Sequence, residues 1–360
     1  MPSSAKRNFT KRTIVHLAEG YCTPRGAKTT RGVLVYSEHD SVAVIDSTNA
    51  GKTARQLLDG GGDIPVVGSL ADVFRMGLKP DTLVVGVTPV GGRLPTSFRR
   101  PVIEALEAGI DVWSGMHQFL QNDQELRLAA ERGGAEIWDV RKPPEDLPVG
   151  MGAMINNKSY SMLMVGTDCA LGKMTAGLVI RDAAKAIGKH YEFVATGQTG
   201  MMITGWGHPV DAIPGDFMCG CVEKDCLSVD GQCDAIIVEG QGSLLHPGYS
   251  PVTLGLLHGC MPDGMILCHQ PSRTAVSNRE HVLIPALSIV AKLYEDVQKL
   301  LKPSRVIGGV LNTHGMAEDT ARAAIEAAEN DLGRPVTDPV RFGAEVLVEA
   351  IEKHRKEIGK

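Results

Sequence analysis

A glycine-bounded loop that ends in a lysine is the part of this sequence best suited to chemistry. It runs from Gly166 to Thr175 and reads Gly-Thr-Asp-Cys-Ala-Leu-Gly-Lys-Met-Thr. The apolar run 161–165 precedes it and an apolar pattern of helical spacing follows it. Strand, glycine loop, Gly-Lys and helix in this order are typical of a phosphate-binding loop, because glycines let the backbone fold around an anion and a helix N-terminus presents N–H groups to it.

The spacing of this loop departs from the usual P-loop. Five residues separate Gly166 from Gly172 instead of four, and Met174 stands where Ser or Thr is expected. Lys173 would add a positive charge, and the Thr175 hydroxyl could reach a phosphate or a metal. An ordinary turn at a helix start is the alternative interpretation. The working prediction is a polyphosphate-bearing ligand, held by Gly166, Thr167, Asp168, Gly172, Lys173, Met174 and Thr175.

A carboxylate and an imidazole follow another expected strand, residues 234–238. Glu239 opens the sequence Gly-Gln-Gly-Ser, and His246 comes shortly afterwards. Beside a phosphate-binding loop, these groups are candidates for proton removal or metal coordination. A purely structural role is the alternative, and it weighs more for His246 than for Glu239.

Further polar residues lie where strands or loops are expected. Asn312 ends the strand 305–311 with an amide that could read the edge of a purine. Asp211 and Asp216 lie in a stretch expected to be irregular, where each could approach a cation or remain a solvated loop acid.

The turn Gly91-Gly92-Arg93 follows an expected strand at 82–87. Open α/β sheets bind ligands at the carboxyl ends of their parallel strands. Arg93 could therefore hold a carboxylate or phosphate through two hydrogen bonds. A solvated turn arginine is the alternative.

Short apolar runs alternate with helical patterns over the first 140 residues, which predicts a doubly wound, Rossmann-like domain. One strand is expected at 31–36, and Ser69 is expected to cap a helix. No Gly-x-Gly-x-x-Gly follows the first strand, so the sequence does not support a dinucleotide cofactor.

The polar, proline-rich stretch 141–148 predicts a linker between domains 1–148 and 149–360. Apolar runs in the second domain predict a second doubly wound parallel sheet, and two helices are expected at 318–332 and 343–356. The strands are expected at 161–165, 191–195, 234–238, 264–268 and 305–311.

Composition excludes several classes of function. A net charge of −5 argues against nucleic acid as the main partner. The longest apolar runs are too short to span a membrane, and residues 1–10 lack the apolar centre of a secretory signal. We therefore expect a soluble cytoplasmic protein that acts on small molecules. The cluster Cys219, Cys221, Cys226 and Cys233 lacks the Cys-x-x-Cys pairs of zinc sites, so we expect buried thiols and no metal.

The second domain resembles dethiobiotin synthetase and its P-loop relatives over most of residues 160–315. The similarity lies in Gly-Thr-Asp-x-x-x-Gly-Lys, in Gln-Thr-Gly at 198–200, in Val-Glu-Gly-x-Gly at 238–242 and in Asn312. The synthetases carry a Lys-Pro pair before their Thr-Gly turn, where this chain has Val194-Ala195-Thr196. The chain thus lacks the lysine that serves ATP-dependent carboxylate chemistry.

A closer resemblance covers nearly the whole chain. The family was long described as a domain of unknown function and often labelled an NAD-dependent epimerase/dehydratase. Its members are described as D-glutamate N-acetyltransferases of the DgcN type, with a Rossmann-like domain joined to a P-loop-like domain. The motifs that carry the resemblance are Ala27-Lys28-Thr29, Gly91-Gly92-Arg93-Leu94-Pro95, Ser114-Gly115-Met116-His117, Asp139-Val140-Arg141, the loop from Gly166 to Thr175, and Val238-Glu239-Gly240-Gln241-Gly242-Ser243 with His246-Pro247.

This resemblance implies acetyl transfer from acetyl-CoA to the amine of D-glutamate. The loop and Asn312 would hold the coenzyme phosphates, and Glu239 or His246, together with Lys173, would form the catalytic group. Main-chain N–H groups near 240–242 would stabilise the oxyanion. The acceptor would contact Arg93, Gln241, Ser243, Arg273 and Arg279.

Two rival functions remain open from the sequence. One is an ATP-dependent kinase or ligase of the dethiobiotin synthetase type, under which alone Mg²⁺ would be a possible cofactor. The other is a non-enzymatic nucleotide-binding regulator. A homo-oligomer is expected whichever of the three functions holds.

Overall fold

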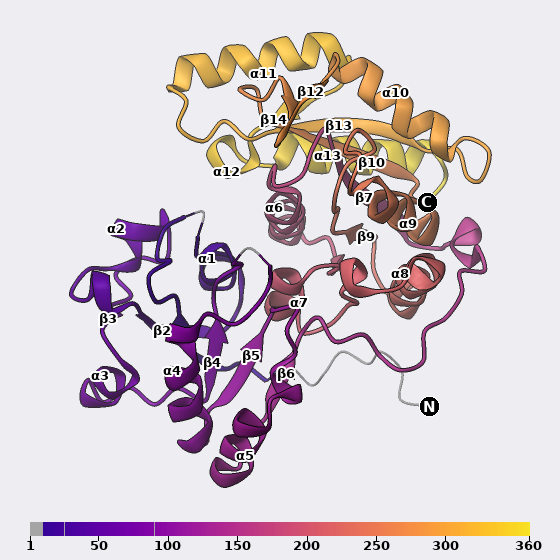
Figure 1. The fold of residues 1–360 in the computed structure, drawn as a ribbon. Coiled ribbons are helices and arrows are strands. Elements are labelled where there is room, and N and C mark those ends of the chain that lie inside the picture. Colours follow the sequence, from indigo (N-terminus) through magenta and orange to yellow (C-terminus); the bar gives the residue numbers. More distant parts are fainter. Residues whose placement is uncertain (1–9, 25, 90) are drawn as a thin grey trace. The chain divides into compact units, whose positions relative to one another are not determined.

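The computed structural model describes residues 10–24, 26–89 and 91–360. The chain forms two compact units (Figure 1). The N-terminal unit comprises the described residues up to 143 together with 198–212, and the C-terminal unit comprises 144–197 and 213–360. The segment considered for a secretory signal lies almost wholly in residues 1–9, outside the described part of the chain.

The N-terminal unit is built on a six-stranded sheet of order β3-β2-β1-β4-β5-β6. All neighbouring strands are parallel, so this unit confirms the expected Rossmann-like, doubly wound fold. Its strands are β1 (Thr13–Leu17), β2 (Asp40–Ile45), β3 (Val66–Val67), β4 (Thr82–Val85), β5 (Asp111–Ser114) and β6 (Ile137–Asp139). The chain order reverses between β1 and β4, which is the place where such sheets open a crevice for ligands.

The helices of this unit begin with side-chain caps at several positions. Ser69 accepts a hydrogen bond from the Asp72 N–H, as expected, and Thr53 forms a capping box with Gln56. The helices are α1 (Lys28–Tyr36), α2 (Ala54–Leu58), α3 (Leu70–Arg75), α4 (Thr96–Glu107), α5 (Gln124–Gly133) and α7 (Gln198–Thr204), with 3₁₀ turns η1 (Ser47–Asn49), η2 (Leu120–Asn122) and η4 (Val210–Ala212).

The expectation of a strand at 31–36 is wrong, because these are the last six of the nine residues of helix α1. The run Val33-Leu34-Val35-Tyr36 has strand propensity, but tertiary packing overrides it. Thr29, Thr30 and Val33 are buried at helical spacing, and the Thr30 N–H donates to the carbonyl oxygen of Gly86 beyond β4.

Segment 198–212 packs with the N-terminal unit, although the division expected from the sequence assigns it to the second domain. Helix α7 contacts α1, where the hydroxyl oxygens of Thr29 and Thr199 lie 3.2 Å apart. Asp211, in η4, forms an ion pair with Arg141. After β8 the chain therefore returns to the N-terminal unit over residues 198–212.

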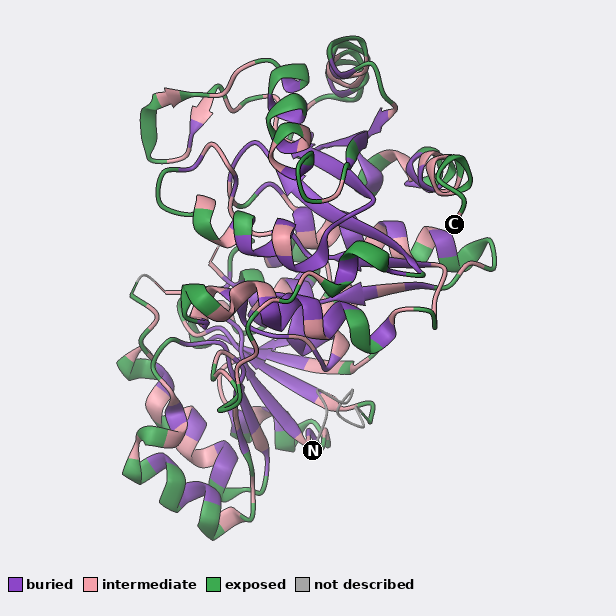
Figure 2. Ribbon diagram, turned by 90° about the vertical axis from the view of Figure 1, so that its right-hand side faces the viewer, coloured by how far each residue is buried: buried purple, intermediate pink, exposed green. Residues whose placement is uncertain are grey.

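The C-terminal unit contains a second six-stranded parallel sheet, of order β14-β13-β10-β7-β9-β8. Its strands are β7 (Tyr160–Gly166), β8 (Tyr191–Val194), β9 (Ala235–Val238), β10 (Gly264–His269), β13 (Arg305–Leu311) and β14 (Val336–Thr337). The five expected strands are confirmed. The two-residue edge strand β14 and the antiparallel hairpin of β11 (Ala275–Val276) and β12 (Arg279–Leu283) were not foreseen. Figure 2 shows the strands of both sheets buried along most of their length.

Helices cover this sheet in two groups. Helix α6 packs against β7, β8, α12 and α13, whereas α8 packs against α9, and α9 against β7. The helices are α6 (Lys173–Ala186), α8 (Gly215–Val229), α9 (Ser250–Cys260), α10 (Leu287–Gln298), α11 (Glu318–Leu332), α12 (Pro339–Phe342) and α13 (Glu345–Glu357), with a 3₁₀ turn η3 (Ala153–Asn156). Among the described residues, no helix has both the length and the apolar character that crossing a membrane requires.

Helix α8 replaces the irregular stretch expected around Asp216, which is exposed in the first turn of that helix. The cysteine cluster lies in and just after α8. Cys221 and Cys226 are buried, as expected, and Cys219 and Cys233 are half-buried. Burial raises the pKa of Cys221 to about 11, so this thiol stays protonated and acts as a small apolar side chain.

Candidate active site

The loop between β7 and α6 has the backbone of a phosphate-binding turn. Gly172 adopts φ +98° directly before the helix, and Ala170 is also left-handed at φ +53°. Lys173 begins α6, and Met174 and Thr175 are half-buried in its first turn. The N-terminus of a fourteen-residue helix therefore faces the loop, and its N–H groups favour an anion there.

The Lys173 side chain is only 5% exposed and lies across this loop. Its Nζ donates to the carbonyl oxygen of Asp168 at 2.7 Å and to that of Gly242 at 2.9 Å. A Cβ atom added to Gly166 would lie 3.2 Å from the same nitrogen. The ammonium group thus joins the β7–α6 loop to the loop that follows β9.

Asp168 is fully buried and forms an ion pair with Arg273, whose Nη1 lies 2.8 Å from Oδ2. Burial alone would raise the pKa of this carboxyl, but hydrogen bonds from Ser277, Cys169 and Arg273 outweigh it and lower the pKa. Arg273 also donates to the carbonyl oxygen of Cys169. The structure therefore assigns Arg273 to holding the loop. Arg279 is exposed on the β11–β12 hairpin, where it donates to the Asn278 carbonyl.

Glu239 follows β9 and is 6% exposed. Its Oε2 accepts hydrogen bonds from the main-chain N–H groups of Thr196, at 2.9 Å, and Gly197, at 3.1 Å. Gln241 donates from Nε2 to the carbonyl oxygen of Thr196. The carboxyl ends of β8 and β9 are thereby joined, and the Glu239 carboxylate is held in one orientation.

His246 is buried beside Tyr249, and their ring centroids lie 4.5 Å apart. The Nδ1 atom of His246 accepts a hydrogen bond from the Gly248 N–H at 3.0 Å. Because an amide N–H can only donate, the neutral ring must carry its proton on Nε2. His246 is therefore better placed to donate a hydrogen bond than to remove a proton.

One potential ligand atom from each of Asp168, Cys169 and His246 lies within 4.8 Å of the other two. A soft metal could match such a donor set. However, both Asp168 oxygens already accept hydrogen bonds, and the Nδ1 lone pair of His246 faces the Gly248 N–H. The three side chains are therefore arranged for hydrogen bonding more than for metal coordination.

The remaining predicted side chains of this unit also lie near the loop. The Thr167 hydroxyl is 2.9 Å from Nδ1 of His269, and Asn312 Nδ2 donates to the Leu171 carbonyl at 3.4 Å. Burial, and then the charge of Arg273, lower the pKa of His269 to about 4, so this ring is neutral near pH 7. Ser243 is fully buried, and its Oγ accepts from the Leu245 N–H at 3.2 Å.

Sequence reasoning missed Tyr294 as part of this site. This buried side chain, in α10, donates from its hydroxyl to the Gly166 carbonyl at 2.8 Å and accepts from the Leu244 N–H at 3.1 Å. It therefore fixes both loops that Lys173 joins. Nothing in the helical pattern around Tyr294 points to this role.

Arg93 belongs to the other unit. It lines a surface pocket of about 450 Å³ with Gly91, His117 and Gln118. The sequence-predicted residues therefore fall into two groups, one around the Lys173 loop and one beyond β4 of the N-terminal sheet.

A buried parallel strand that runs into a glycine loop and a helix headed by lysine defines the C-terminal unit as an α/β domain of the P-loop class. The chain belongs to the DUF1611 family of proteins. Residues 148–348 match its model described as a domain of unknown function, DUF1611_C, P-loop domain, and residues 47–143 match the DUF1611_N Rossmann-like domain. These matches confirm the family resemblance and the fold class expected from the sequence.

Three relatives illustrate the similarity. A D-glutamate N-acetyltransferase of Tritonibacter scottomollicae is 38% identical over 272 residues, which cover 75% of this chain and 80% of that protein. One from Pseudoalteromonas sp is 34% identical over 282 residues, or 78% of this chain and 83% of that protein. The crystal structure of a DUF1611 family protein from Anabaena variabilis matches with a TM-score of 0.90 at 38% identity, covering 95% of this chain and 100% of that one.

Proposed function

We propose that this protein is an N-acetyltransferase that transfers acetyl from acetyl-CoA to the amino group of D-glutamate or a similar acidic D-amino acid, giving N-acetyl-D-glutamate. The observation that carries the proposal is the identity of 38% and 34%, over at least three quarters of the chain, to two proteins named D-glutamate N-acetyltransferase. The P-loop-type geometry around Lys173 supports a phosphate-bearing donor.

The loop before α6 is the proposed binding site for the coenzyme phosphates. Coenzyme A carries a diphosphate and a 3′-phosphate, which the N–H groups at the start of α6 and the Lys173 ammonium can bind. In this role Lys173 would exchange a carbonyl contact for a charged phosphate oxygen, and charge-assisted hydrogen bonds are the stronger ones. No step of acetyl transfer requires cleavage of a phosphate bond, so the altered spacing between Gly166 and Gly172 is compatible with it.

Acetyl transfer needs a base because the amine of D-glutamate must lose its proton to attack the thioester carbonyl. We assign this role to Glu239, whose carboxylate is oriented by the Thr196 and Gly197 N–H groups. His246 would act as a hydrogen-bond donor through its Nε2–H group and not as the base. Main-chain N–H groups near 240–242 would stabilise the oxyanion as the amine nitrogen bonds to carbon and the coenzyme thiolate leaves.

Acceptor recognition would involve side chains with spare hydrogen-bonding capacity. Gln241 is partly exposed on the same loop as Glu239 and is the proposed polar contact. Ser243, expected from the sequence to contact the acceptor, is fully buried, and its hydroxyl already accepts from the Leu245 N–H. Arg279 is exposed and could meet an acidic group, whereas Arg273 is engaged by Asp168. Arg93 lies in its own pocket and is considered below.

The experiment is to incubate the pure protein with acetyl-CoA and D-glutamate, measuring release of the coenzyme thiol and N-acetyl-D-glutamate by mass spectrometry. L-Glutamate and D-glutamine serve as alternative acceptors. We expect thiol release that depends on D-glutamate and matches the product in amount. Absence of product would contradict the proposal. ADP release from ATP in a parallel reaction with Mg²⁺ would instead support the kinase or ligase class.

A further inference from the structure

The N-terminal unit has a surface pocket that the P-loop chemistry does not explain. Its volume is about 450 Å³, and Gly91, Arg93, His117 and Gln118 line it. These residues follow β4 and β5, so the pocket opens at the carboxyl ends of two adjacent parallel strands. Ligands bind at this edge in open α/β sheets.

The two loops that form the pocket are held together by main-chain bonds. The carbonyl oxygen of Gly92 accepts from the N–H groups of His117, at 2.9 Å, and Gln118, at 3.0 Å. Gln118 in turn accepts from the Leu94 N–H at 3.1 Å. Gly92 has φ +62°, and a Cβ there would lie 2.5 Å from the His117 ring. The contact requires glycine, so the position of the imidazole is built into the Gly-Gly-Arg turn.

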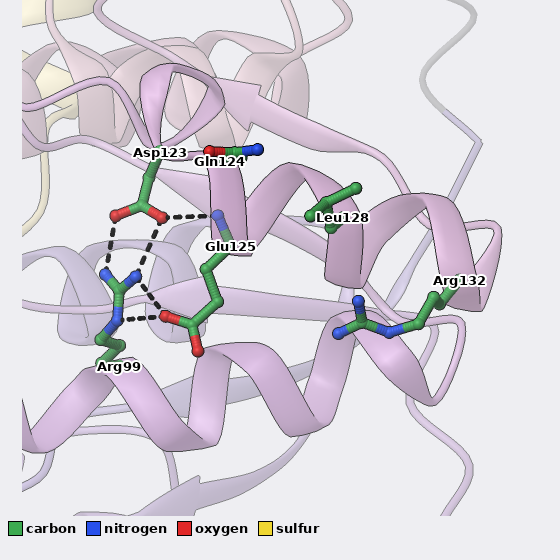
Figure 3. A pocket seen from close by; sticks show the side chains of 6 residues that line it. All are labelled: Arg99, Asp123, Gln124, Glu125, Leu128 and Arg132. Atoms are coloured by element: carbon green, nitrogen blue, oxygen red, sulfur yellow. Dashed lines mark hydrogen bonds and ion pairs between the residues drawn. The ribbon is translucent and has the colours of Figure 1, made fainter.

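The pocket is rich in hydrogen-bond donors without protein acceptors. Arg93 is exposed, and within the described part of the chain neither its guanidinium nor the His117 ring makes a hydrogen bond or ion pair. Arg99, six residues further on, differs. Figure 3 shows its guanidinium facing Asp123 and Glu125, with Nη1 2.7 Å from one Asp123 oxygen and Nη2 2.9 Å from the other. Acidic partners neutralise Arg99, whereas Arg93 keeps its charge for a ligand.

We infer that the pocket of Arg93 and His117 binds an oxyanion, namely a carboxylate group of the amino-acid acceptor. A guanidinium presents two parallel N–H groups that fit a carboxylate, and the imidazole adds a third donor. This inference rests on the proposed function for the identity of the acceptor. The 3′-phosphate of the coenzyme is the other oxyanion that this donor set could take.

The test compares Arg93→Gln with Arg100→Gln, which removes the same charge from an exposed arginine outside the pocket. Initial rates are measured with D-glutamate, acetyl-CoA and 3′-dephospho-acetyl-CoA. For Arg93→Gln we expect the KM for D-glutamate to rise at least about tenfold, because a charge-assisted contact is lost, while the KM for acetyl-CoA stays within about twofold. Arg100→Gln should match the wild type.

A rise confined to the KM for acetyl-CoA, and absent with the dephospho form, would overturn the carboxylate assignment in favour of the coenzyme phosphate. Unchanged KM values in Arg93→Gln would overturn the oxyanion pocket itself.

Titration calorimetry with D-glutamate separates this inference from the proposed function, because a binding measurement needs no turnover. Binding that Arg93→Gln weakens supports the pocket even if no acetyl transfer occurs. Absence of binding to the wild type would overturn it.

Discussion

The Lys173 ammonium nitrogen lies 2.9 Å from the carbonyl oxygen of Gly242. This bond connects a residue of the P-loop-type turn to one 69 positions later, in the loop that carries Glu239 and Gln241. Lys173, together with Tyr294, therefore links the proposed donor site to the loop that carries the proposed catalytic carboxylate. A coenzyme phosphate that draws the Lys173 ammonium group away from these carbonyl oxygens would change the contacts of both the β7–α6 loop and the loop after β9.

Replacing Lys173 with methionine should raise the KM for acetyl-CoA at least about tenfold, because the change removes a charged phosphate contact and keeps the length of the side chain. The KM for D-glutamate should change little. Two carbonyl oxygens also lose their donor, so we expect a loss of about 1–3 kcal/mol in the free energy of unfolding. Steady-state kinetics and urea denaturation provide the readouts. Lys356→Met, at an exposed position in α13, is the control. An unchanged KM for acetyl-CoA would place the donor elsewhere.

Replacing Glu239 with glutamine should lower kcat about 100-fold or more if the carboxylate removes the amine proton. The amide oxygen of glutamine can still accept from the Thr196 and Gly197 N–H groups, so the fold and both KM values should be nearly preserved. Glu326→Gln, on the exposed side of α11, controls for the charge change. Normal turnover in Glu239→Gln would exclude it as the base.

Much of the fold could be predicted because its signals are local. The apolar run before Gly166 and the Gly-Lys pair fix a strand, a turn and a helix within a few residues. The same reasoning failed at 31–36, where the apolar run Val33-Leu34-Val35-Tyr36 suggested a strand. These residues instead belong to α1, a helix that buries Thr29, Thr30 and Val33.

The contacts of the site were less predictable because they join distant parts of the sequence. Tyr294 is 128 positions from Gly166, and Arg273 is 105 positions from Asp168. A sequence pattern identifies an arginine as a possible anion ligand, but it cannot show that a buried aspartate already binds the guanidinium. The Gly-Gly-Arg turn was recognisable, whereas the packing of His117 on Gly92 needed the structure.

Gly240 should not tolerate a side chain. A Cβ at this position would lie 1.6 Å from the Met164 carbonyl oxygen and 2.9 Å from Cδ of Lys173, so the loop after β9 would have to move away from β7. Gly240→Ala should therefore lose acetyl transfer and also lower the free energy of unfolding, measured by urea denaturation, by an amount typical of overpacking, about 1–3 kcal/mol. Gly215→Ala is the matched control, because a Cβ there meets no atom within 4 Å. Equal effects of the two changes would contradict the close packing of this loop.

His16 should make the N-terminal unit sensitive to acid. It is fully buried in β1, and its Nε2 bonds to the Ser41 hydroxyl at 2.8 Å. Burial, and then the charge of His39, lower its pKa from 6.5 to about 3. Between these values the unfolded chain binds a proton on this ring that the folded chain does not. Stability should therefore be highest above pH 6.5 and fall with decreasing pH down to about 3, with His16 contributing up to about 1.4 kcal/mol per pH unit.

This dependence can be measured by urea denaturation followed by tryptophan fluorescence, because Trp113, Trp138 and Trp206 all belong to the N-terminal unit. His16→Gln can keep the bond to Ser41 but does not titrate, so its unfolding free energy should change less steeply between pH 6.5 and pH 3 than that of the wild type. His281→Gln removes an exposed imidazole of the other unit and should follow the wild type. Parallel curves for wild type and His16→Gln would show that His16 gains its proton equally easily in the folded and unfolded chains. The acid sensitivity of this unit would then come from other groups, such as His39, whose pKa is also lowered mainly by burial.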